Sequence, residues 1–428
     1  MTTCAQEHGL ASPDAAAMWL RRAWGTVFSF EAALALFLFA GRYKNDPRFA
    51  WIPIDMTVAT GALSVLAALV VLYRRRGRIR RNAVVLVGLF MAFAGYAALS
   101  LLWTPGVEYA RTKALYLAGL VGWAVVATAG VVAYERVRVR RLLVALVLFA
   151  VWMALETSLL YMRSGYARLA DVMGSNYLGI GRCVGLGVLV VFAYLLYEAR
   201  GRASLLACLA LLAWLGFVML MLPGRGPLLA TVVPMGIPLL AGVRWRRRQP
   251  SGVTFSRSAW RALVAVLVGA AAVVTAVLTS RRLISLLRIA TIFVAEGGGL
   301  SAGTRLARYH DAVHLWLLEP LLGHGIGAFP IVTGFSDTRV YPHQMLLETL
   351  VELGLVGAVL LIGFIVYAFR SLGTWTEIKR DSLRLAVLMV VINTMINAAV
   401  SGDLPDNRVM FAMLGLMVFP WRGLHPRA

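Results

Sequence analysis

The sequence has few charged residues and very little cysteine. Only 14% of its 428 residues are charged, whereas about 25% are charged in a typical soluble domain. Its three cysteines, Cys4, Cys183 and Cys208, form no CxxC pair, and the last two lie in apolar segments. We therefore interpret them as small buried residues and expect neither a disulfide framework nor a cysteine-based metal site.

Several functional motifs are also missing. The chain contains no P-loop, no GxGxxG before a predicted helix and no GxSxG. These motifs bind nucleotide phosphates or present a nucleophilic serine. Nothing in the sequence therefore indicates ATP hydrolysis or serine-based catalysis.

Acidic residues are scarce. The chain has 20 Asp and Glu against 42 Lys and Arg, a formal net charge of +22. Such an excess is found in nucleic-acid-binding proteins, but here the basic residues lie in short clusters between apolar segments. That distribution is typical of the charges that orient membrane helices, so we expect no nucleic-acid partner.

Long apolar segments dominate the chain, which is 60% hydrophobic with a mean hydropathy of +0.77. The segments are about 18–23 residues long, which is enough to cross the hydrocarbon core of a bilayer. We predict an all-α polytopic membrane protein with about twelve transmembrane helices. The predicted spans are 24–41, 51–73, 82–103, 114–133, 142–162, 177–197, 203–222, 227–243, 260–279, 343–369, 385–401 and 408–421.

The first span resembles a signal peptide, because Arg21 and Arg22 precede an apolar run that ends near Ala40. Eleven further spans favour an uncleaved first helix. Across the short loops and termini, 26 Lys and Arg lie on one side and 9 on the other. The richer side is expected to be cytoplasmic, which puts both termini in the cytoplasm.

The only long loop, 280–342, then lies outside. The predicted parts are a transmembrane bundle at 1–279, an outer helical loop at 280–342 and C-terminal transmembrane helices at 343–428. Within the loop, 281–293 has the pattern of an interfacial amphipathic helix. A second helix is predicted from Thr304, as N-cap, to Leu318, where Pro320 ends it. The segment GHGIGAFP at 323–330 is predicted to form a glycine-rich turn.

Arginines on the outer side oppose the orientation rule and therefore indicate binding. Arg182 lies about five residues inside a span, where a charge is costly. Arg225 occupies a PGRG hinge between two spans, and Arg305 and Arg308 share one face of the loop helix. Because guanidinium binds phosphate bidentately, these residues indicate a site for a lipid-linked diphosphate. The alternative is snorkelling to ordinary lipid phosphates.

His343 follows Pro342 at the start of a predicted span. Proline favours the first helical turn, so we expect His343 near a helix N-terminus. The helix dipole and nearby arginines disfavour imidazolium there, and a neutral imidazole suits a general base. A histidine that caps the helix or faces headgroups is the alternative.

Other polar residues carry weaker signals. His310 and His314 have HxxxH spacing but lack a third ligand, so we expect no metal site. Glu348 and Glu352 share a helical face and are predicted to form a structural pair with an arginine. Three charged residues of an outer loop are interpreted as interface residues: Asp403, Asp406 and Arg408.

Two segments resemble the signature region of the O-antigen ligase and O-antigen polymerase superfamily. They are GTRLARYHDAVHLWLLEPLLGHGIGAF at 303–329 and HQMLLETLVELGLVG at 343–357. The family pattern has an arginine-bearing helix, a glycine turn, and a histidine followed by asparagine at the start of a helix. Gln344 stands here in place of that asparagine. Arg225 resembles the family's arginine between two mid-chain spans, and Arg305 resembles its loop arginine.

The resemblance implies a glycosyltransferase of the Gram-negative inner membrane that uses neither metal nor nucleotide, so we expect no cofactor. Its donor would be undecaprenyl-diphosphate-linked O-antigen, and its acceptor would be lipid A–core oligosaccharide. Together with the arginines and His343, the resemblance favours an O-antigen ligase whose active site faces the periplasm.

The predicted mechanism is a single displacement with inversion at the anomeric carbon. Arg182, Arg225 and Arg305, supported by Arg308 or Arg288, would bind the diphosphate and stabilise its developing charge. His343 would take the proton from the acceptor hydroxyl.

Three alternatives remain open. The first is a polymerase of the same superfamily, and the second is a protein O-oligosaccharyltransferase. The short stretch after the last predicted span weighs against the second. The third is a twelve-helix transporter, although such proteins often have a long central cytoplasmic loop that is missing here.

Overall fold

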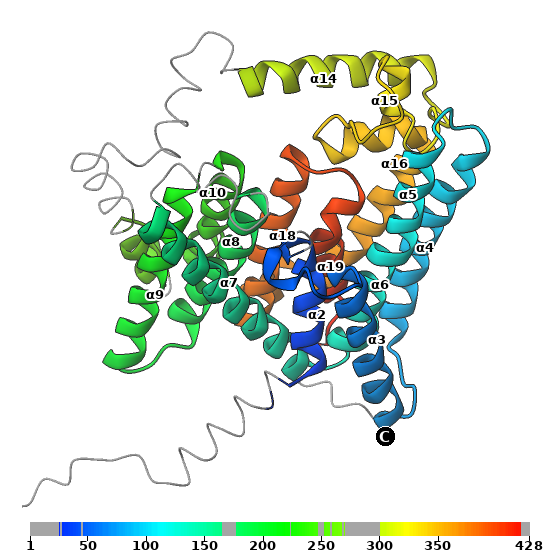
Figure 1. The fold of residues 1–428 in the computed structure, drawn as a ribbon. Coiled ribbons are helices and arrows are strands. Elements are labelled where there is room, and N and C mark those ends of the chain that lie inside the picture. Colours follow the sequence, from blue (N-terminus) through cyan, green and yellow to red (C-terminus); the bar gives the residue numbers. More distant parts are fainter. Residues whose placement is uncertain are drawn as a thin grey trace, which may run out of the picture.

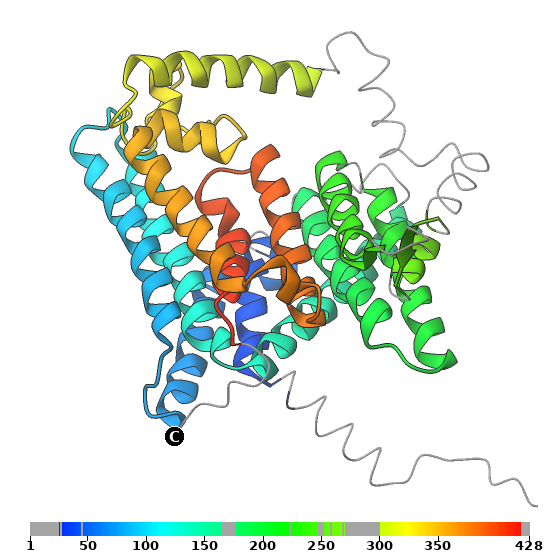
Figure 2. The same ribbon diagram turned by 180° about the vertical axis from the view of Figure 1, so that it is seen from behind.

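The computed structural model describes residue 25 and residues 28–43, 46–164, 177–222, 224–246, 252–256, 259–267, 269 and 300–420. These residues form a bundle of long helices, with one helix lying across its end (Figures 1 and 2). The predicted all-α membrane fold is confirmed. One short antiparallel hairpin interrupts the helices of the described part, with β1 at Val243–Arg246 and β2 at Gly252–Phe255.

Nine helical runs in the described part are long and apolar enough to cross a membrane. Single helices form five of them: α3 (Met56–Arg74), α8 (Tyr177–Tyr197), α9 (Arg202–Met221), α16 (Met345–Leu372) and α18 (Ser382–Val400). α7 (Arg136–Ser164) supplies another, over Arg136–Arg163. The other three are composite: Arg81–Leu102 begins with α4 (Arg81–Leu99), Glu108–Tyr134 contains α5 (Glu108–Tyr116) and α6 (Gly122–Val125), and Arg225–Gly242 contains α10 (Arg225–Val232) and α11 (Ile237–Gly242).

Three predicted spans differ from this set. The helices α2 (Phe30–Phe39) and α19 (Arg408–Leu416) lie within predicted spans 24–41 and 408–421 but have only 10 and 9 residues. Most of the predicted span 260–279 lies outside the described residues. The division of the chain at 279 and 342 stays a prediction.

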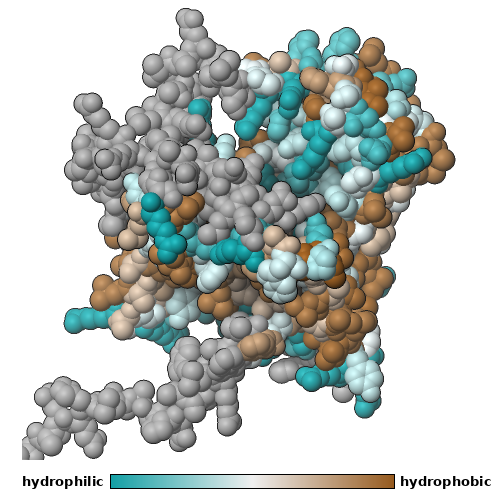
Figure 3. Space-filling view, viewed as in Figure 1, coloured by the Kyte–Doolittle hydropathy of each residue, from teal (hydrophilic) through white to brown (hydrophobic). Residues whose placement is uncertain are grey.

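The helices pack through aromatic rings and small residues, and the outer surface of the bundle is apolar. At the centre, the rings of Phe90, Phe364 and Phe411 lie with centroids 5.4–5.9 Å apart. Close approach of α7 and α8 depends on Gly187, where an added Cβ would lie 2.5 Å from the Cβ of Ala150. On the outside, hydrophobic side chains form a belt below the hydrophilic α14 end of the bundle (Figure 3). Small residues at helix contacts and apolar residues outside are typical of membrane bundles.

The helix across the end of the bundle is α14 (Leu300–Leu318) (Figure 1). It ends at Leu318 as predicted, but Thr304 lies inside the helix, so the predicted N-cap is wrong. The preceding Ser301-Ala302-Gly303 segment is helical; the helix therefore needs no side-chain cap at Thr304. The other predicted loop helix, 281–293, lies outside the described residues.

A break in α16 explains the glycine-rich turn. Gly354 has φ 62° and ψ −162°, a conformation that is essentially restricted to glycine. The break exposes backbone groups that would otherwise bond within the helix, and the turn supplies their partners. The four bonds are His324 N–H to Val351 O (2.9 Å), Gly325 N–H to Glu352 O (2.8 Å), Leu355 N–H to Pro320 O (2.9 Å) and Val356 N–H to Leu321 O (3.2 Å).

The same turn is held against the start of α5. Gly325 and Gly327 both have positive φ, and a Cβ at either would lie 2.6 Å from a backbone Cα, of Thr104 or Ala110. Asp337 then caps α5, since its Oδ2 accepts from the backbone N–H of Glu108 at 2.7 Å. The segment between α14 and α16 is therefore fixed to the bundle, together with the polar side chains it carries.

We predict that Gly354→Ala destabilises the protein by more than about 2 kcal/mol. A Cβ there would need the glycine-only conformation and would lie 2.2 Å from Leu321 O. The measurement is thermal unfolding of the purified protein in detergent. Gly363→Ala is the control, because Gly363 lies within the same helix and a Cβ there meets no described atom within 4 Å. Equal unfolding temperatures for the two variants would contradict the structural role of the break.

Candidate functional site

A cavity of about 830 Å³ opens near the α14 end of the bundle. Its charged lining consists of four arginines and two aspartates: Arg42, Arg182, Arg339, Arg408, Asp55 and Asp406. Much of the remaining lining is apolar, including Leu38, Phe39, Val58, Leu120, Met153, Leu178 and Met410. We call it the arginine cavity. It combines a cationic wall with space for an apolar chain.

Arg182 reaches this cavity from α8. Its Nη2 donates to the carbonyl of Ser401 at 2.9 Å, and its buried Nε has no hydrogen-bond partner among the described residues. Arg225 begins α10 after the predicted hinge, and a Cβ at the adjacent Gly226 would lie 3.3 Å from Val400. Both arginines are therefore positioned near the C-terminal end of α18, although Arg225 is not part of the cavity lining.

The second predicted group gathers on α14. Nη1 of Arg308 lies 2.7 Å from Nε2 of His343. Because arginine can only donate hydrogen bonds, Nε2 must be the acceptor, and the proton of the neutral imidazole lies on Nδ1. Nδ1 is buried without a hydrogen-bond partner in the described part of the chain.

His343 lies directly before the N-cap of α16, near a helix N-terminus as predicted. The helix begins at Met345, and Gln344 is its N-cap, whose side chain accepts from the N–H of Leu347. His343 precedes the cap with φ 66°, a conformation that is rare for a residue other than glycine. Gln344 thus has a capping role, and asparagine, which is usual at this position in the family, is also a good N-cap.

The imidazole is nonetheless neutral, as predicted. Partial burial, followed by the charges of Arg308 and Arg305, lowers the pKa of His343 to about 4. The causes are desolvation and arginines, with no need for the helix dipole. Tyr341 connects His343 to the arginine cavity, because its ring lies 4.5 Å from the imidazole and also lines the cavity.

The predicted arginines thus form two neighbouring groups. Of those in the described residues, Arg182 lines the arginine cavity, whereas Arg225, Arg305 and Arg308 do not. Arg288 lies outside the described residues. Arg339 and Arg408 line the cavity but were not predicted from the sequence to belong to the site.

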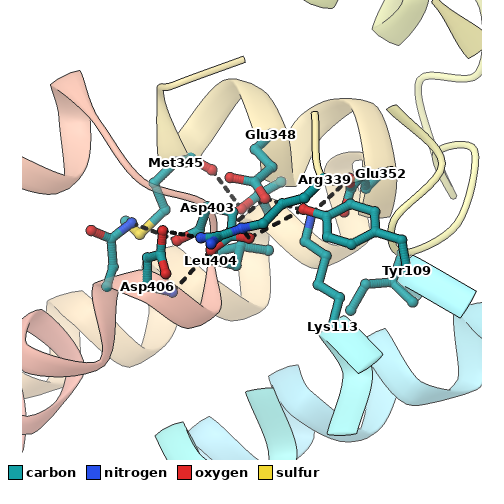
Figure 4. A network of polar contacts seen from close by, with 12 residues as sticks. Tyr109, Lys113, Arg339, Met345, Glu348, Glu352, Asp403, Leu404 and Asp406 are labelled. Atoms are coloured by element: carbon teal, nitrogen blue, oxygen red, sulfur yellow. Dashed lines mark hydrogen bonds and ion pairs between the residues drawn. The ribbon is translucent and has the colours of Figure 1, made fainter. Parts of the chain in front are cut away.

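A buried ion cluster supports this end of the bundle (Figure 4). Lys113 of α5 lies 2.5 Å from Glu348 and 2.7 Å from Glu352 of α16, and all three side chains have no exposed surface. The predicted pairing of the two glutamates with an arginine is therefore wrong; their partner is a lysine. Such a cluster is costly to bury and costly to break.

The cluster continues into the loop between α18 and α19. Glu348 accepts from the N–H of Leu404 at 3.2 Å, and Tyr109 donates to Asp403 at 3.1 Å. Arg339 donates to Asp403 at 3.0 Å and also forms an ion pair with Asp406. Burial opposes ionisation of Asp403, but Arg339 and Lys113 together lower its pKa below the usual value. The anion of Asp403 therefore fixes Arg339 at the cavity.

The HxxxH histidines lie apart from this site. The His310 side chain is 85% exposed on α14 and has an aspartate, Asp311, at 3.9 Å. Within the described ranges, no three His, Cys, Asp or Glu side chains come together as a metal site.

Fold and site together define a polytopic membrane protein with a cationic, partly apolar cavity near one end of its helix bundle. Residues 210–362 match the sequence model of the O-antigen ligase family. The match spans the Arg225 hinge, α14, the glycine turn and the start of α16. It confirms the resemblance to the O-antigen ligase and polymerase superfamily and implies a glycosyltransferase-type enzyme of O-antigen processing. No curated protein matches the chain significantly.

We predict that Lys113→Met destabilises the protein by about 3–5 kcal/mol, because it leaves two buried carboxylates without their cation. The measurement is chemical or thermal unfolding in detergent. Arg111→Met is the control: it removes an exposed cation from the same helix and should change stability by less than about 0.5 kcal/mol. A Lys113→Met protein as stable as wild type would show that the cluster has no structural role.

Proposed function

We propose that this protein is an O-antigen ligase. It transfers the polysaccharide from undecaprenyl diphosphate to lipid A–core oligosaccharide at the periplasmic face of the inner membrane, with both termini in the cytoplasm. The observation that carries the proposal is the arginine cavity, where cationic and apolar linings meet beside a neutral histidine.

The donor fits this cavity by its chemistry. A lipid-linked diphosphate has an anionic group joined directly to a long apolar chain. The guanidinium of Arg182 lies beside the C-terminal end of α18, where it donates to Ser401. Its Nε has no hydrogen-bond partner among the described residues. Arg225, near the C-terminal end of α18, and Arg305, whose charge acts on His343, would contribute to the same site in this proposal. Arginines there would stabilise negative charge on the leaving group.

His343 acts as general base in this proposal. The acceptor oxygen bonds to the anomeric carbon, the bond from that carbon to the phosphate oxygen breaks, and undecaprenyl diphosphate leaves. The acceptor proton goes to Nε2 of His343, which first has to give up its hydrogen bond from Arg308. An incoming diphosphate competes for that arginine and thereby frees Nε2.

Binding of the donor would also raise the pKa of His343 and make it a stronger base. A pKa of about 4 keeps His343 neutral but makes it weak, whereas an efficient general base has a pKa near the working pH. The nearby arginines are a main cause of the low value. A bound diphosphate would neutralise their charge and raise the pKa of His343 in the complex.

A polymerase is the second candidate, because the superfamily that the sequence resembles contains both O-antigen ligases and O-antigen polymerases. It would use the same donor site and extend the lipid-linked chain. A protein O-oligosaccharyltransferase would use the same donor site with another acceptor, and no feature of the described residues favours it or a transporter over the ligase.

The deciding prediction concerns transfer in vitro. Purified protein, undecaprenyl-diphosphate-linked glycan and lipid A–core are mixed with a chelator present. We expect ligated product from wild type and at least about a 100-fold lower rate for His343→Ala, the usual effect of losing a general base. Arg182→Ala and Arg225→Ala should raise the KM for the donor.

His314→Ala is the matched control, because His314 is an exposed histidine on α14; its rate should equal that of wild type. Longer lipid-linked chains from the donor alone, without ligation, would assign the protein as a polymerase. Full activity of His343→Ala would remove the proposed base, and retention at the anomeric carbon would exclude direct displacement.

The pH dependence tests the tuning of His343. The acidic limb of kcat/KM reports the free enzyme, so we expect its midpoint near pH 4, where His343 becomes protonated. The limb of kcat reports the complex and should lie at higher pH. Coincident limbs would show that the donor does not change the pKa of the base.

A further inference from the structure

A second cavity, of about 540 Å³, adjoins the arginine cavity. Its charged lining has the opposite balance, with four acidic and two basic side chains: Glu108, Asp337, Asp403, Asp406, Lys113 and Arg339. Two tyrosines and two threonines complete most of the wall: Tyr109, Tyr116, Thr112 and Thr338. We call it the acidic cavity. None of the residues predicted from the sequence to bind diphosphate lines it.

The two cavities meet along a shared border. Tyr116, Arg339, Pro405 and Asp406 line both. Arg339 is fixed at this border by Asp403 and Asp406 (Figure 4). A molecule that crosses the border therefore passes from a cationic wall to an anionic one.

The lining decides which part of a substrate each cavity accepts. Excess carboxylates disfavour phosphate in the acidic cavity, because like charges repel. Carboxylates instead accept hydrogen bonds from neutral hydroxyl groups, and threonine and tyrosine hydroxyls can donate to these groups as well as accept from them. Exposed aromatic rings such as that of Tyr116 offer an apolar face to the C–H groups of a sugar ring. The volume lies within the usual range of about 300–1,000 Å³ for small-molecule sites.

We propose that the acidic cavity is a glycan subsite, which holds neutral sugar residues next to the diphosphate in the arginine cavity. The inference rests on the proposed function for the choice of glycan. Two glycans have the required chemistry: the acceptor core oligosaccharide and the donor polysaccharide. Both are hydroxyl-rich and either can supply the bound sugar.

The test is binding of separate substrate parts to the purified protein, which does not require activity. The probes are core oligosaccharide released from lipid A, O-antigen glycan released from its lipid carrier, and undecaprenyl diphosphate without sugar. Thr112→Trp fills the acidic cavity from an exposed position on α5. We expect it to weaken binding of one glycan at least ten-fold and to leave binding of undecaprenyl diphosphate unchanged.

Val58→Trp is the matched variant. Val58 is an exposed residue, 57% accessible, that lines only the arginine cavity, so the same replacement should weaken binding of undecaprenyl diphosphate and not of the glycan. Val84→Trp, at an exposed position of α4 outside both cavities, should change neither.

The outcomes separate the two proposals. Loss of core oligosaccharide binding in Thr112→Trp assigns the subsite to the acceptor, and loss of O-antigen glycan binding assigns it to the donor. Unchanged binding of both glycans overturns the subsite. If Thr112→Trp acts as expected but no ligation is measured with any substrate pair, the proposed function fails while the glycan subsite stands.

Discussion

The buried contact of Lys113 with Glu348 and Glu352 is the interaction on which this end of the molecule depends. It joins α5 to α16 without exposed charge, and Glu348 also holds the backbone of the loop after α18 through Leu404. In a bilayer, helices gain little from the hydrophobic effect on association, so polar contacts and close packing determine their arrangement. The cluster therefore fixes α5, which carries Tyr109, and the start of α16 against the loop that carries Asp403, the partner of Arg339.

The break at Gly354 serves the same end of the bundle by a different means. A continuous α16 would satisfy its own backbone and leave the glycine turn without partners. The broken helix exchanges four backbone hydrogen bonds with the turn instead, and the turn's positive-φ glycines allow direct contact with α5. The segment that carries Arg339, Tyr341 and His343 is consequently held at both sides. The glycines of the family motif thus have a geometric role in positioning the site.

The sequence predicted the membrane fold well, because span length and hydropathy are local properties of the chain. It also predicted a neutral His343 and singled out Arg182, which lines the arginine cavity; diphosphate binding by Arg182 stays a prediction. It missed the partner of Glu348 and Glu352, because Lys113 lies 239 residues before Glu352 in the chain. It predicted His343 near a helix N-terminus but not its positive φ, which tertiary contacts impose on a residue other than glycine. No local pattern distinguished Arg339 from an ordinary loop arginine, because its ion pairs with Asp403 and Asp406 are tertiary contacts.

The ion pairs of Arg339 show how the border between the cavities can respond to a substrate. Its partner Asp403 is buried, whereas the Arg339 and Asp406 side chains are 52% and 41% exposed. Exposed pairs contribute at most about 1 kcal/mol, and losing one partner of a buried pair costs more. A phosphate bound in the arginine cavity, as proposed, would therefore compete with Asp406 at small cost while Asp403 keeps Arg339 in place. Asp406 would then accept hydrogen bonds on the acidic side of the border.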